Sequence, residues 1–358
     1  MNEMDYVEYI DCGEYLILYR MYGGGEEAFV PAFVDGKPVR ELADHVFAEE
    51  ASGRYRPERI KAAVRRGDDY LPSDVRPSDE EVLCAGKLRL VEIPDGVEEI
   101  GSYAFYGCYY LKEIRFPSSL RRTGSGLFTA CPAIRRMVFE SADGGTPFLL
   151  GEIIGAVTYE LEARATLSGK ELWRLLFPEY YEESKENTPA RIIEIIWHGM
   201  GYQYRNCFLS RQVQFRRYDA LFPLSIAQES PETCRKIAMD RLRLMRMPGE
   251  DSPDEPAGQR ALFERSFRES RPAEADRKRY VEYLQENPEA LAGEILRQQE
   301  EPPEEELKAL EAAGYFTAEN IRCFIDSASR LGKADAVSYL MNVKRERFPE
   351  SGRRKYEF

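Results

Sequence analysis

Histidine and cysteine are the side chains best suited to nucleophilic or acid–base chemistry, and the sequence brings few of them close together. The two histidines are His45 and His198, and Cys207 follows His198 after a short interval. A Cys–His pair needs a third group that orients the base, and the neighbouring residues supply none. We therefore assign no catalytic residue. An enzyme with a site at a domain junction, around His198, Cys207 and Tyr204, is kept as an alternative function.

Each histidine also has a structural interpretation. His45 lies in a predicted turn, where we expect it to be structural or solvated. His198 follows the run RIIEIIW and precedes a glycine. We expect it to end a helix and to interact with the negative end of the helix dipole.

Metal and phosphate sites have recognisable spacing, and none occurs here. The sequence has no HExxH, no CxxC and no EF-hand loop, so we predict no metal site and no cofactor. Three glycines at 23–25 precede Glu26 and Glu27 instead of Lys-Ser/Thr, which fits a hairpin turn better than a phosphate loop. The seven cysteines are widely spaced and odd in number, which predicts reduced, mostly buried thiols.

One stretch combines basic and aromatic side chains. They are Arg205, Arg211, Arg216 and Arg217, with Tyr202, Tyr204, Phe208, Phe215 and Tyr218. Such a mixture can bind single-stranded nucleic acid, so this is kept as a second alternative function. A solvated helix face over a packed core explains the same pattern, and the formal net charge of −13 makes nucleic acid an unlikely partner.

The bulk composition limits the class of protein. A chain of 358 residues predicts about two domains, and the net negative charge disfavours anionic membranes. The start, MNEMDYVEYIDCGEYLILYR, is acidic where a signal peptide is basic. No run approaches the roughly 18–20 apolar residues of a membrane helix. We expect a cytoplasmic protein without membrane contact.

A repeat of 23 residues dominates the segment from Leu88 to Glu140. Like residues recur at this spacing in eight columns: Leu88/Leu111/Ile134, Val91/Ile114/Met137, Ile93/Phe116/Phe139, Pro94/Pro117, Val97/Leu120, Gly101/Gly124, Phe105/Phe128 and Cys108/Cys131. An apolar pattern with a period of 20–29 residues is typical of leucine-rich repeats. In each row a short strand ends at proline, and SYAFYGC forms a helical turn with Phe105 inward. We expect Gly124 to relieve a tight turn.

A further row lies upstream. Val39, Leu42, Ala43 and Phe47 match Val97, Ile100, Gly101 and Phe105 at a constant offset of 58. Residues 49–86 then form an insertion, for which we predict one short helix near Pro57–Arg66 and a loop. About four rungs are expected, a rung being one turn of the solenoid.

The register predicts which side chains become neighbours. Cys108 and Cys131 fall on adjacent rungs, where a buried thiol column is favoured over a disulfide. Four pairs of opposite charge should form ladders: Glu92–Arg115, Glu98–Arg121, Glu99–Arg122 and Glu113–Arg136. Each exposed pair contributes about 0.2–1 kcal/mol, so the ladders favour the register more than they stabilise the fold.

These rows resemble the BspA-type leucine-rich repeat family over residues 14–140. Ile93 to Leu111 fits the pattern IP-x-x-V-x-x-I-G-x-x-A-F-x-x-C-x-x-L, and VPAFVDGKPV is similar to the β-hairpin that leads into the first repeat. The second row departs from it, since Thr123 replaces the isoleucine. Many members are surface adhesins with signal peptides, and because this sequence shows none, we do not carry that role over.

The C-terminal half changes period. PETCRKIAMDRLRLM, ADRKRYVEYLQEN and EEELKALEAAG have helical apolar spacing, and Ile321, Phe324, Ile325 and Ala328 form one stripe. Thr317 and Asn287 are predicted N-caps, and MPGEDSPDEPAG is a candidate linker or loop. The tail GKADAVSYLMNVKRERF is similar to degenerate ankyrin-like helix pairs that follow such repeats in some bacterial proteins.

Together these patterns predict an α+β chain. Residues 1–145 are expected to form a leucine-rich repeat domain with an N-terminal hairpin cap, and residues 146–358 an α-helical domain of antiparallel helix pairs. Solenoids usually bind rather than catalyse, so the leading hypothesis is a non-enzymatic, intracellular bacterial scaffold for protein–protein interaction. We expect binding through the repeat strand face, the helical domain or both. On the strand face the predicted site is formed by Glu92, Glu113, Arg115, Arg136 and Val138.

Overall fold

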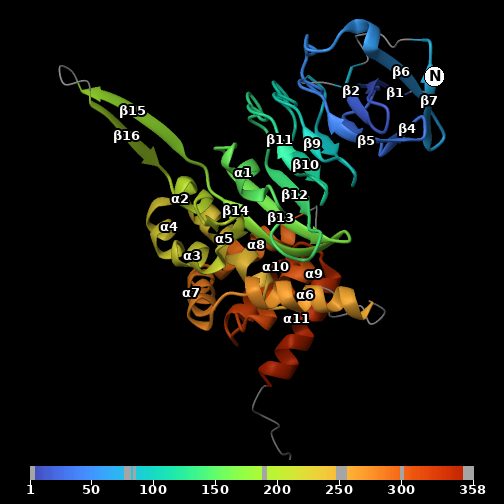
Figure 1. The fold of residues 1–358 in the computed structure, drawn as a ribbon. Helices are drawn as coiled ribbons and strands as arrows, with labels where there is room; N and C mark the ends of the chain where they lie inside the picture. Colours follow the sequence, from blue (N-terminus) through green and yellow to red (C-terminus); the bar gives the residue numbers. More distant parts are fainter. Residues whose placement is uncertain are drawn as a thin grey trace, which may run out of the picture. The chain divides into compact units, whose positions relative to one another are not determined.

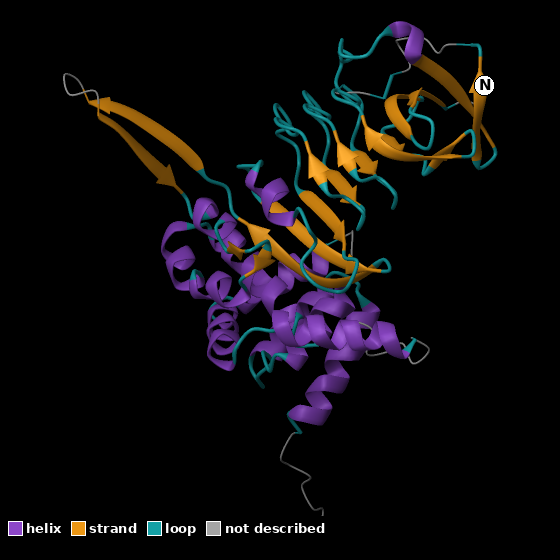
Figure 2. Ribbon diagram, in the orientation of Figure 1, coloured by secondary structure: helices purple, strands orange, loops and turns teal. Residues whose placement is uncertain are grey.

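The structure is a computed structural model that describes residues 5–75, 82–83, 86–187, 192–246, 256–298 and 302–349. The chain divides into two compact units, Met1–Gln214 and Phe215–Phe358. Strands dominate the first unit and helices the second (Figures 1 and 2). The predicted α+β class, with an N-terminal solenoid and a C-terminal helical region, is confirmed.

The solenoid is built on a ladder of parallel strands. In spatial order they are β3 (Glu27–Phe29), β8 (Leu90–Glu92), β10 (Glu113–Phe116), β12 (Arg136–Glu140) and β13 (Leu161–Leu167), and β14 (Lys170–Phe177) closes the sheet antiparallel to β13. Ile114 pairs with Val91 on one side and with Met137 on the other, as the 23-residue register predicts. The ladder is longer than expected, because β13 adds to it without belonging to the repeat.

A second sheet forms the other wall of the solenoid and continues into the N-terminal cap. Its strands are β1 (Tyr6–Asp11), β2 (Leu16–Tyr22), β4 (Phe33–Val34), β5 (Lys37–Leu42), β6 (Ile60–Arg66), β7 (Asp69–Ser73), β9 (Glu99–Ile100) and β11 (Arg122–Thr123). Leu42 pairs with Ile100 in parallel, which confirms the upstream row at an offset of 58.

Matching side chains stack in the interior, as a solenoid requires. The rings of Phe47 and Phe105 lie 5.4 Å apart, those of Phe105 and Phe128 5.6 Å, and those of Phe116 and Phe139 4.9 Å. All three pairs are nearly parallel. The inward position predicted for Phe105 is confirmed, since it has no exposed surface.

Glycine recurs in the rows because consecutive rungs touch at that point. A Cβ at Gly124 would lie 2.3 Å from the backbone nitrogen of Ser102, and one at Gly101 would lie 2.4 Å from that of Asp44. The expected tight turn at Gly124 is therefore corrected: the residue allows close approach of two backbones.

The helix predicted near Pro57–Arg66 is wrong for most of its length. Only Pro57–Arg59 is helical, as a single 3-10 turn, and β6 follows at once. Strand β6 lies between β1 and β7, where Ala62, Ala63 and Val64 are buried. Pairing on both sides overrides the helical preference of its alanines. Residues 76–81 and 84–85 of the insertion lie outside the described residues.

The helical domain expected from residue 146 is also corrected. The helices here are short, α1 (Leu150–Gly155) and α2 (Gly201–Arg205). Strands β13 and β14 lie between these two helices in the chain, together with β15 (Tyr181–Asn187) and β16 (Ile192–His198). Strands β17 (Phe208–Leu209) and β18 (Gln212–Val213) follow α2. The alternating burial of β13, LEARATL, is a strand pattern. The boundary between the two compact units falls in the chain between Gln214 and Phe215, not at residue 146.

Unit 2 is helical in its described residues. Its helices are α3 (Phe215–Ala220), α4 (Phe222–Gln228), α5 (Pro231–Arg243), α6 (Ala257–Ser270), α7 (Glu274–Gln285), α8 (Pro288–Arg297), α9 (Pro303–Ala312), α10 (Asn320–Arg330) and α11 (Ala334–Arg347). The predicted cap at Asn287 is confirmed, because its side chain accepts from the backbone N–H of Ala290. The predicted linker at 247–258 lies mostly outside the described residues.

Thr317 does more than the predicted single cap. Its hydroxyl accepts from the backbone N–H of Asn320 at 3.1 Å, and the Asn320 side chain accepts from the backbone N–H of Thr317 at 2.8 Å. The two residues therefore satisfy each other as in a capping box, with asparagine in place of glutamate or glutamine. The stripe on α10 is confirmed for Ile321, Phe324 and Ala328, which are fully buried, whereas Ile325 is only partly buried.

A charged cluster lies in the core of unit 2. Arg241 on α5 has no exposed surface and donates to both carboxylate oxygens of Asp219 on α3, at 2.6 and 3.0 Å. The Tyr280 hydroxyl on α7 donates to the same carboxylate at 2.8 Å, and Arg241 also donates to the Ser270 carbonyl. This cluster ties together three helices and the end of α6.

Candidate strand-face groove

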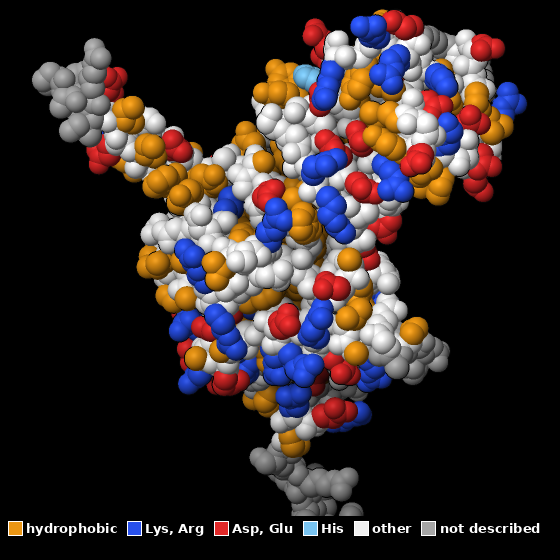
Figure 3. Space-filling view, viewed as in Figure 1, with side chains coloured by type: hydrophobic (Ala, Val, Ile, Leu, Met, Phe, Trp, Pro, Cys, Tyr) orange, Lys and Arg blue, Asp and Glu red, His pale blue; other side chains and the backbone are white. Residues whose placement is uncertain are grey.

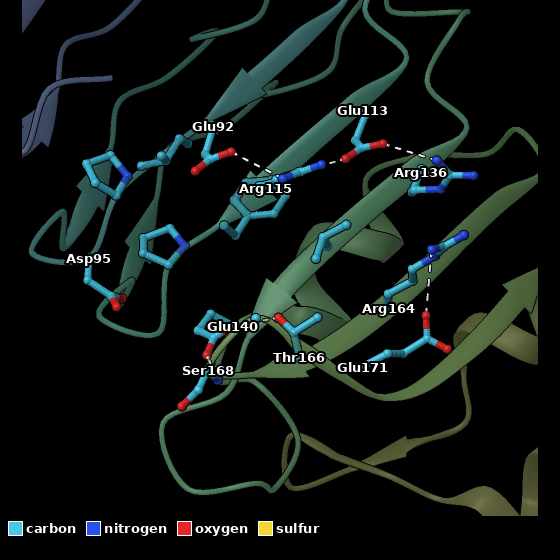
Figure 4. A pocket seen from close by; sticks show the side chains of 16 residues that line it. Glu92, Asp95, Glu113, Arg115, Arg136, Glu140, Arg164, Thr166, Ser168 and Glu171 are labelled. Carbon is cyan, nitrogen blue, oxygen red and sulfur yellow. Dashed lines mark hydrogen bonds and ion pairs between the residues drawn. The ribbon is translucent and has the colours of Figure 1, made fainter. Parts of the chain in front are cut away.

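The five residues predicted as a binding site lie together in a groove on the outer face of the parallel ladder (Figure 4). The groove has a volume of ≈ 570 Å³. The predicted residues in it are Glu92, Glu113, Arg115, Arg136 and Val138. The residues that complete its lining are Ile93, Pro94, Asp95, Phe116, Pro117, Glu140, Arg164, Thr166, Ser168, Gly169 and Glu171.

Strand alternation explains why these side chains share one face. Val91, Ile114 and Met137 point inward and are fully buried, so the residues on either side of each point outward. The register then aligns them across the ladder. Glu92, Arg115, Val138 and Arg164 form one row, and Glu113, Arg136 and Glu162 form the next.

A continuous chain of ion pairs crosses the groove floor. Arg115 lies 3.3 Å from Glu92 and 2.8 Å from Glu113. Arg136 lies 3.2 Å from Glu113 and 2.9 Å from Glu162. Each arginine thus bridges two carboxylates on neighbouring positions of the sheet, which confirms the Glu92–Arg115 and Glu113–Arg136 ladders.

The chain of ion pairs ends at residues that the sequence analysis missed. Arg164 lies 2.5 Å from Glu162 and 3.6 Å from Glu171, and Arg174 lies 2.6 Å from Glu171. These residues come from β13 and β14, which follow the last repeat. The alternating LEARATL pattern, read as a further strand of the ladder, could have indicated Glu162 and Arg164.

The electrostatics follow burial. Burial raises the pKa of Glu162, but the charges of Arg174, Arg164 and Arg136 outweigh it, so the pKa is lowered overall. Hydrogen bonding to Glu113 raises the pKa of Arg115. The chain of ion pairs therefore carries charges of both signs at neutral pH. Arg115, in the groove, is half exposed, and Arg174, outside the groove lining, is buried.

Hydrogen bonds to Glu140 and Asp95 stabilise the turns beside the groove. The Glu140 carboxylate accepts from the Thr166 hydroxyl at 2.6 Å and from the backbone N–H of Ser168. Asp95 accepts from the backbone N–H and the hydroxyl of Ser118 on the next rung, both at 3.0 Å. These bonds fix the turns that border the groove.

The other two predicted ladders have different outcomes. Arg122 pairs with Glu99 at 2.9 Å, as expected. The Glu98–Arg121 pair is wrong: Glu98 pairs with Arg40, and Arg121 donates to the carbonyls of Ser118 and Leu120. Arg40 precedes Glu98 by the same offset of 58 that relates their rows, so the upstream rung supplies the competing cation.

The alternative catalytic site lacks an accessible thiol. Cys207 is 1 % exposed and donates to the Gln203 carbonyl, and Tyr204 is fully buried. His198 does not end a helix as expected. It ends strand β16, where its Nε2 lies 3.0 Å from Glu183 and its ring stacks on Tyr181.

The basic and aromatic stretch is partly core. Arg205 is buried and donates to the carbonyls of Val157, Tyr159, Pro178 and Gly201, and burial lowers its pKa to about 10. The aromatic rings of Tyr204 and Tyr218 are fully buried as well. The exposed members are Arg211, Arg216 and Arg217. The stretch therefore offers fewer groups to a nucleic acid than its sequence indicates.

Cys108 and Cys131, on neighbouring rungs, form no disulfide. Cys108 donates to the Phe47 carbonyl and Cys131 to the Phe105 carbonyl, so each hydrogen-bonds to the rung before it. A hydrogen bond from Cys108 lowers the pKa of Cys131 in spite of burial. Among the described residues, no group of three or more histidine, cysteine, aspartate or glutamate side chains has a geometry that could hold a metal ion.

The fold and the aligned rows define a leucine-rich repeat solenoid. Residues 80–143 match the family model of the BspA type leucine rich repeat region. The match spans less of the chain than the expected residues 14–140, and the ankyrin-like likeness of the tail stays a prediction.

One solved structure, that of a leucine-rich repeat protein of T. pallidum, is similar at 24 % identity over 36 % of this chain and 67 % of that chain, with a TM-score of 0.21. No curated protein matches the chain. In the described part of the chain, no helix has the length and apolar character to cross a membrane.

Proposed function

We propose that this chain is a non-enzymatic binding protein that holds a protein partner in the strand-face groove through Glu92, Glu113, Arg115, Arg136 and Val138. The observation that carries the proposal is the ladder of alternating charges along the groove floor. Leucine-rich repeats present such extended faces, and binding is their common use.

The chemistry of the groove favours binding over catalysis. Arginine stays protonated in proteins and cannot take a proton from a substrate. Glu162, which pairs with the groove residues Arg136 and Arg164, has a lowered pKa, the wrong direction for a general acid or base that acts near neutral pH. The charged side chains of the groove are thus suited to fixed electrostatic contacts.

The alternation of charge predicts the kind of partner surface. A partner must place acidic groups against Arg115 and basic groups against Glu92, at the spacing of the strands. Complementary charge contributes more to specificity and to the association rate than to affinity. We therefore expect a selective partner with side chains of both signs, bound in a salt-dependent manner.

Affinity capture with the full chain tests the proposal. The bait variant carries alanine at Glu92, Arg115 and Val138. The control carries alanine at Glu99 and Arg122, an exposed ion pair of the same type on the other sheet. Proteins retained by the wild type and by the control should be lost from the groove variant in quantitative mass spectrometry. Equal retention by all three baits would exclude this groove as the binding site.

A further inference from the structure

Strands β15 and β16 form an arm with unpaired edges. They pair antiparallel, with Ser184 opposite Ile195, as a two-stranded sheet of their own, and no other described strand pairs with either (Figure 2). Each strand therefore has an outer edge of free backbone N–H and C=O groups. A lone hairpin is only marginally stable in water, and a third strand with an apolar face is what stabilises such a sheet.

One face of β16 carries an exposed apolar stripe. Ile193, Ile195 and Trp197 alternate along β16, so their side chains lie on the same side, and they are 67 %, 45 % and 44 % exposed. The residues opposite them on β15 are polar: Glu186, Ser184 and Glu182. Figure 3 shows hydrophobic side chains gathered along this arm. An apolar stripe rimmed by polar residues marks an interaction site.

The edge of β16 is the more receptive of the two. Strand β15, YEESKEN, carries four charged residues, and charges on an edge discourage strand pairing. Strand β16, IIEIIWH, carries one carboxylate among β-branched and aromatic residues and contains no proline. Such a segment has high β-propensity and pairs readily with another extended chain.

The charge of the arm selects the chemistry of that chain. Its described residues include four glutamates and one lysine: Glu182, Glu183, Glu186, Glu194 and Lys185. Glu183 contacts His198 and Lys185, at 3.0 and 3.4 Å, and Lys185 lies opposite Glu194 in the register. With four carboxylates and one lysine, the described residues of the arm keep a net negative charge. A second copy of this chain would bring the same net negative charge and meet repulsion, whereas the net charge of the arm attracts a basic segment.

We propose that the edge of β16 accepts an extended, basic segment of another protein as a third strand. Alternate residues of this segment are apolar and cover Ile193, Ile195 and Trp197. The residues between them are lysine or arginine and lie beside Glu194 on the opposite face. Main-chain hydrogen bonds supply affinity, and the alternating side chains supply specificity. The site is separate from the strand-face groove and does not depend on the function proposed for it.

Tryptophan fluorescence of the full chain provides the readout. The chain has two tryptophans, of which Trp173 is 2 % exposed and Trp197 is 44 % exposed. The probe is a seven-residue peptide of alternating valine and lysine, matched to the length of β16. Binding should shift the Trp197 emission to shorter wavelength and protect it from quenching by acrylamide.

Two comparison peptides separate the parts of the proposal. Replacing lysine by glutamate tests charge, and N-methylating alternate peptide bonds removes the donors that strand pairing needs. Each should bind the wild-type chain at least about tenfold more weakly. Equal binding of the glutamate peptide overturns the basic partner, and equal binding of the methylated peptide overturns strand addition.

Variants of the arm complete the test. Ile195→Lys should lose the peptide by about tenfold or more, and Glu194→Lys should reverse the preference toward the glutamate peptide. Leu209→Lys, at a side chain 66 % exposed on β17, is the matched control and should bind as the wild type. Sedimentation identifies the other occupant: a wild-type dimer that Ile195→Lys dissociates, without peptide binding, would assign the arm to a second copy and overturn the proposal.

Discussion

The buried cluster of Asp219, Arg241 and Tyr280 should be the most sensitive electrostatic element of unit 2. Asp219→Ala removes the acceptor of two hydrogen bonds from Arg241 and one from Tyr280, while Arg241 stays buried. Removing one partner of a buried ion pair costs about 3–5 kcal/mol, because the remaining charge is uncompensated. For a domain near 150 residues, 1 kcal/mol shifts the melting temperature by roughly 2–4 °C. The expected decrease is therefore about 6–20 °C.

Thermal unfolding of the full chain, followed by circular dichroism at about 222 nm to report the helices of unit 2, measures this decrease. The matched control is Lys236→Ala, which removes an exposed pair with Glu232 one helical turn away at 2.9 Å. That pair contributes about 0.3–0.5 kcal/mol, so the control should melt within about 2 °C of the wild type. The double change Asp219→Leu with Arg241→Met should recover much of the loss, since an apolar pair needs no charge compensation. A melting temperature for Asp219→Ala that matched the control would refute the reasoning.

Three further predictions concern unit 1. Phe105→Ala should destabilise it by about 3–5 kcal/mol in urea unfolding, because the ring stacks on both neighbouring rungs; a loss below about 1 kcal/mol would contradict the stacked core. Gly124→Ala should lower the melting temperature, because the added Cβ would overlap the backbone of Ser102. The control Gly155→Ala has open space around its Cβ and should leave the melting temperature unchanged or raise it. Equal effects of the two variants would contradict the close approach of the backbones at Gly124 and Ser102. The pKa of Glu162 is lowered from 4.5, so its ionised carboxylate contributes fully to the free energy of unfolding above pH 4.5, and this contribution is lost as the pH falls through the pKa of the folded state. Between pH 7 and 3, Glu162→Gln should therefore lose less stability than the wild type in urea titrations. Parallel dependence of the two proteins on pH would contradict this.

The parts of the fold that repeat could be predicted from the sequence, because like residues at one spacing encode their own register. The pairing of Ile114 with Val91 and Met137 follows from that spacing, as does the stacking of Phe105 on Phe128. The groove floor was predictable for the same reason, since outward side chains of aligned strands must be neighbours.

The remainder depends on contacts that local sequence does not specify. Strand β6 is a strand because β1 and β7 flank it, and its IKAAVRR sequence has no strong pattern of its own. Arg164 and Glu171 extend the groove from strands that lack the repeat, so no column of like residues pointed to them. Glu98 has a rung on each side, and its carboxylate pairs with Arg40 of the upstream rung instead of Arg121 of the downstream one, a choice that the 23-residue spacing alone does not specify.

The pairing of β5 with β9 shows that neighbouring rungs need not be 23 residues apart in the chain. These strands are 58 residues apart, yet they stack in the register that other rungs reach in 23, since the extra chain leaves after Phe47 and returns before Leu88. The corner after Phe47 is thus a site that tolerates insertions, because added residues there leave the stacked side chains of neighbouring rungs in register. A foreign domain grafted at this corner should leave the groove intact, whereas a single residue inserted between Ile114 and Phe116 would turn the outward row of charges into the core.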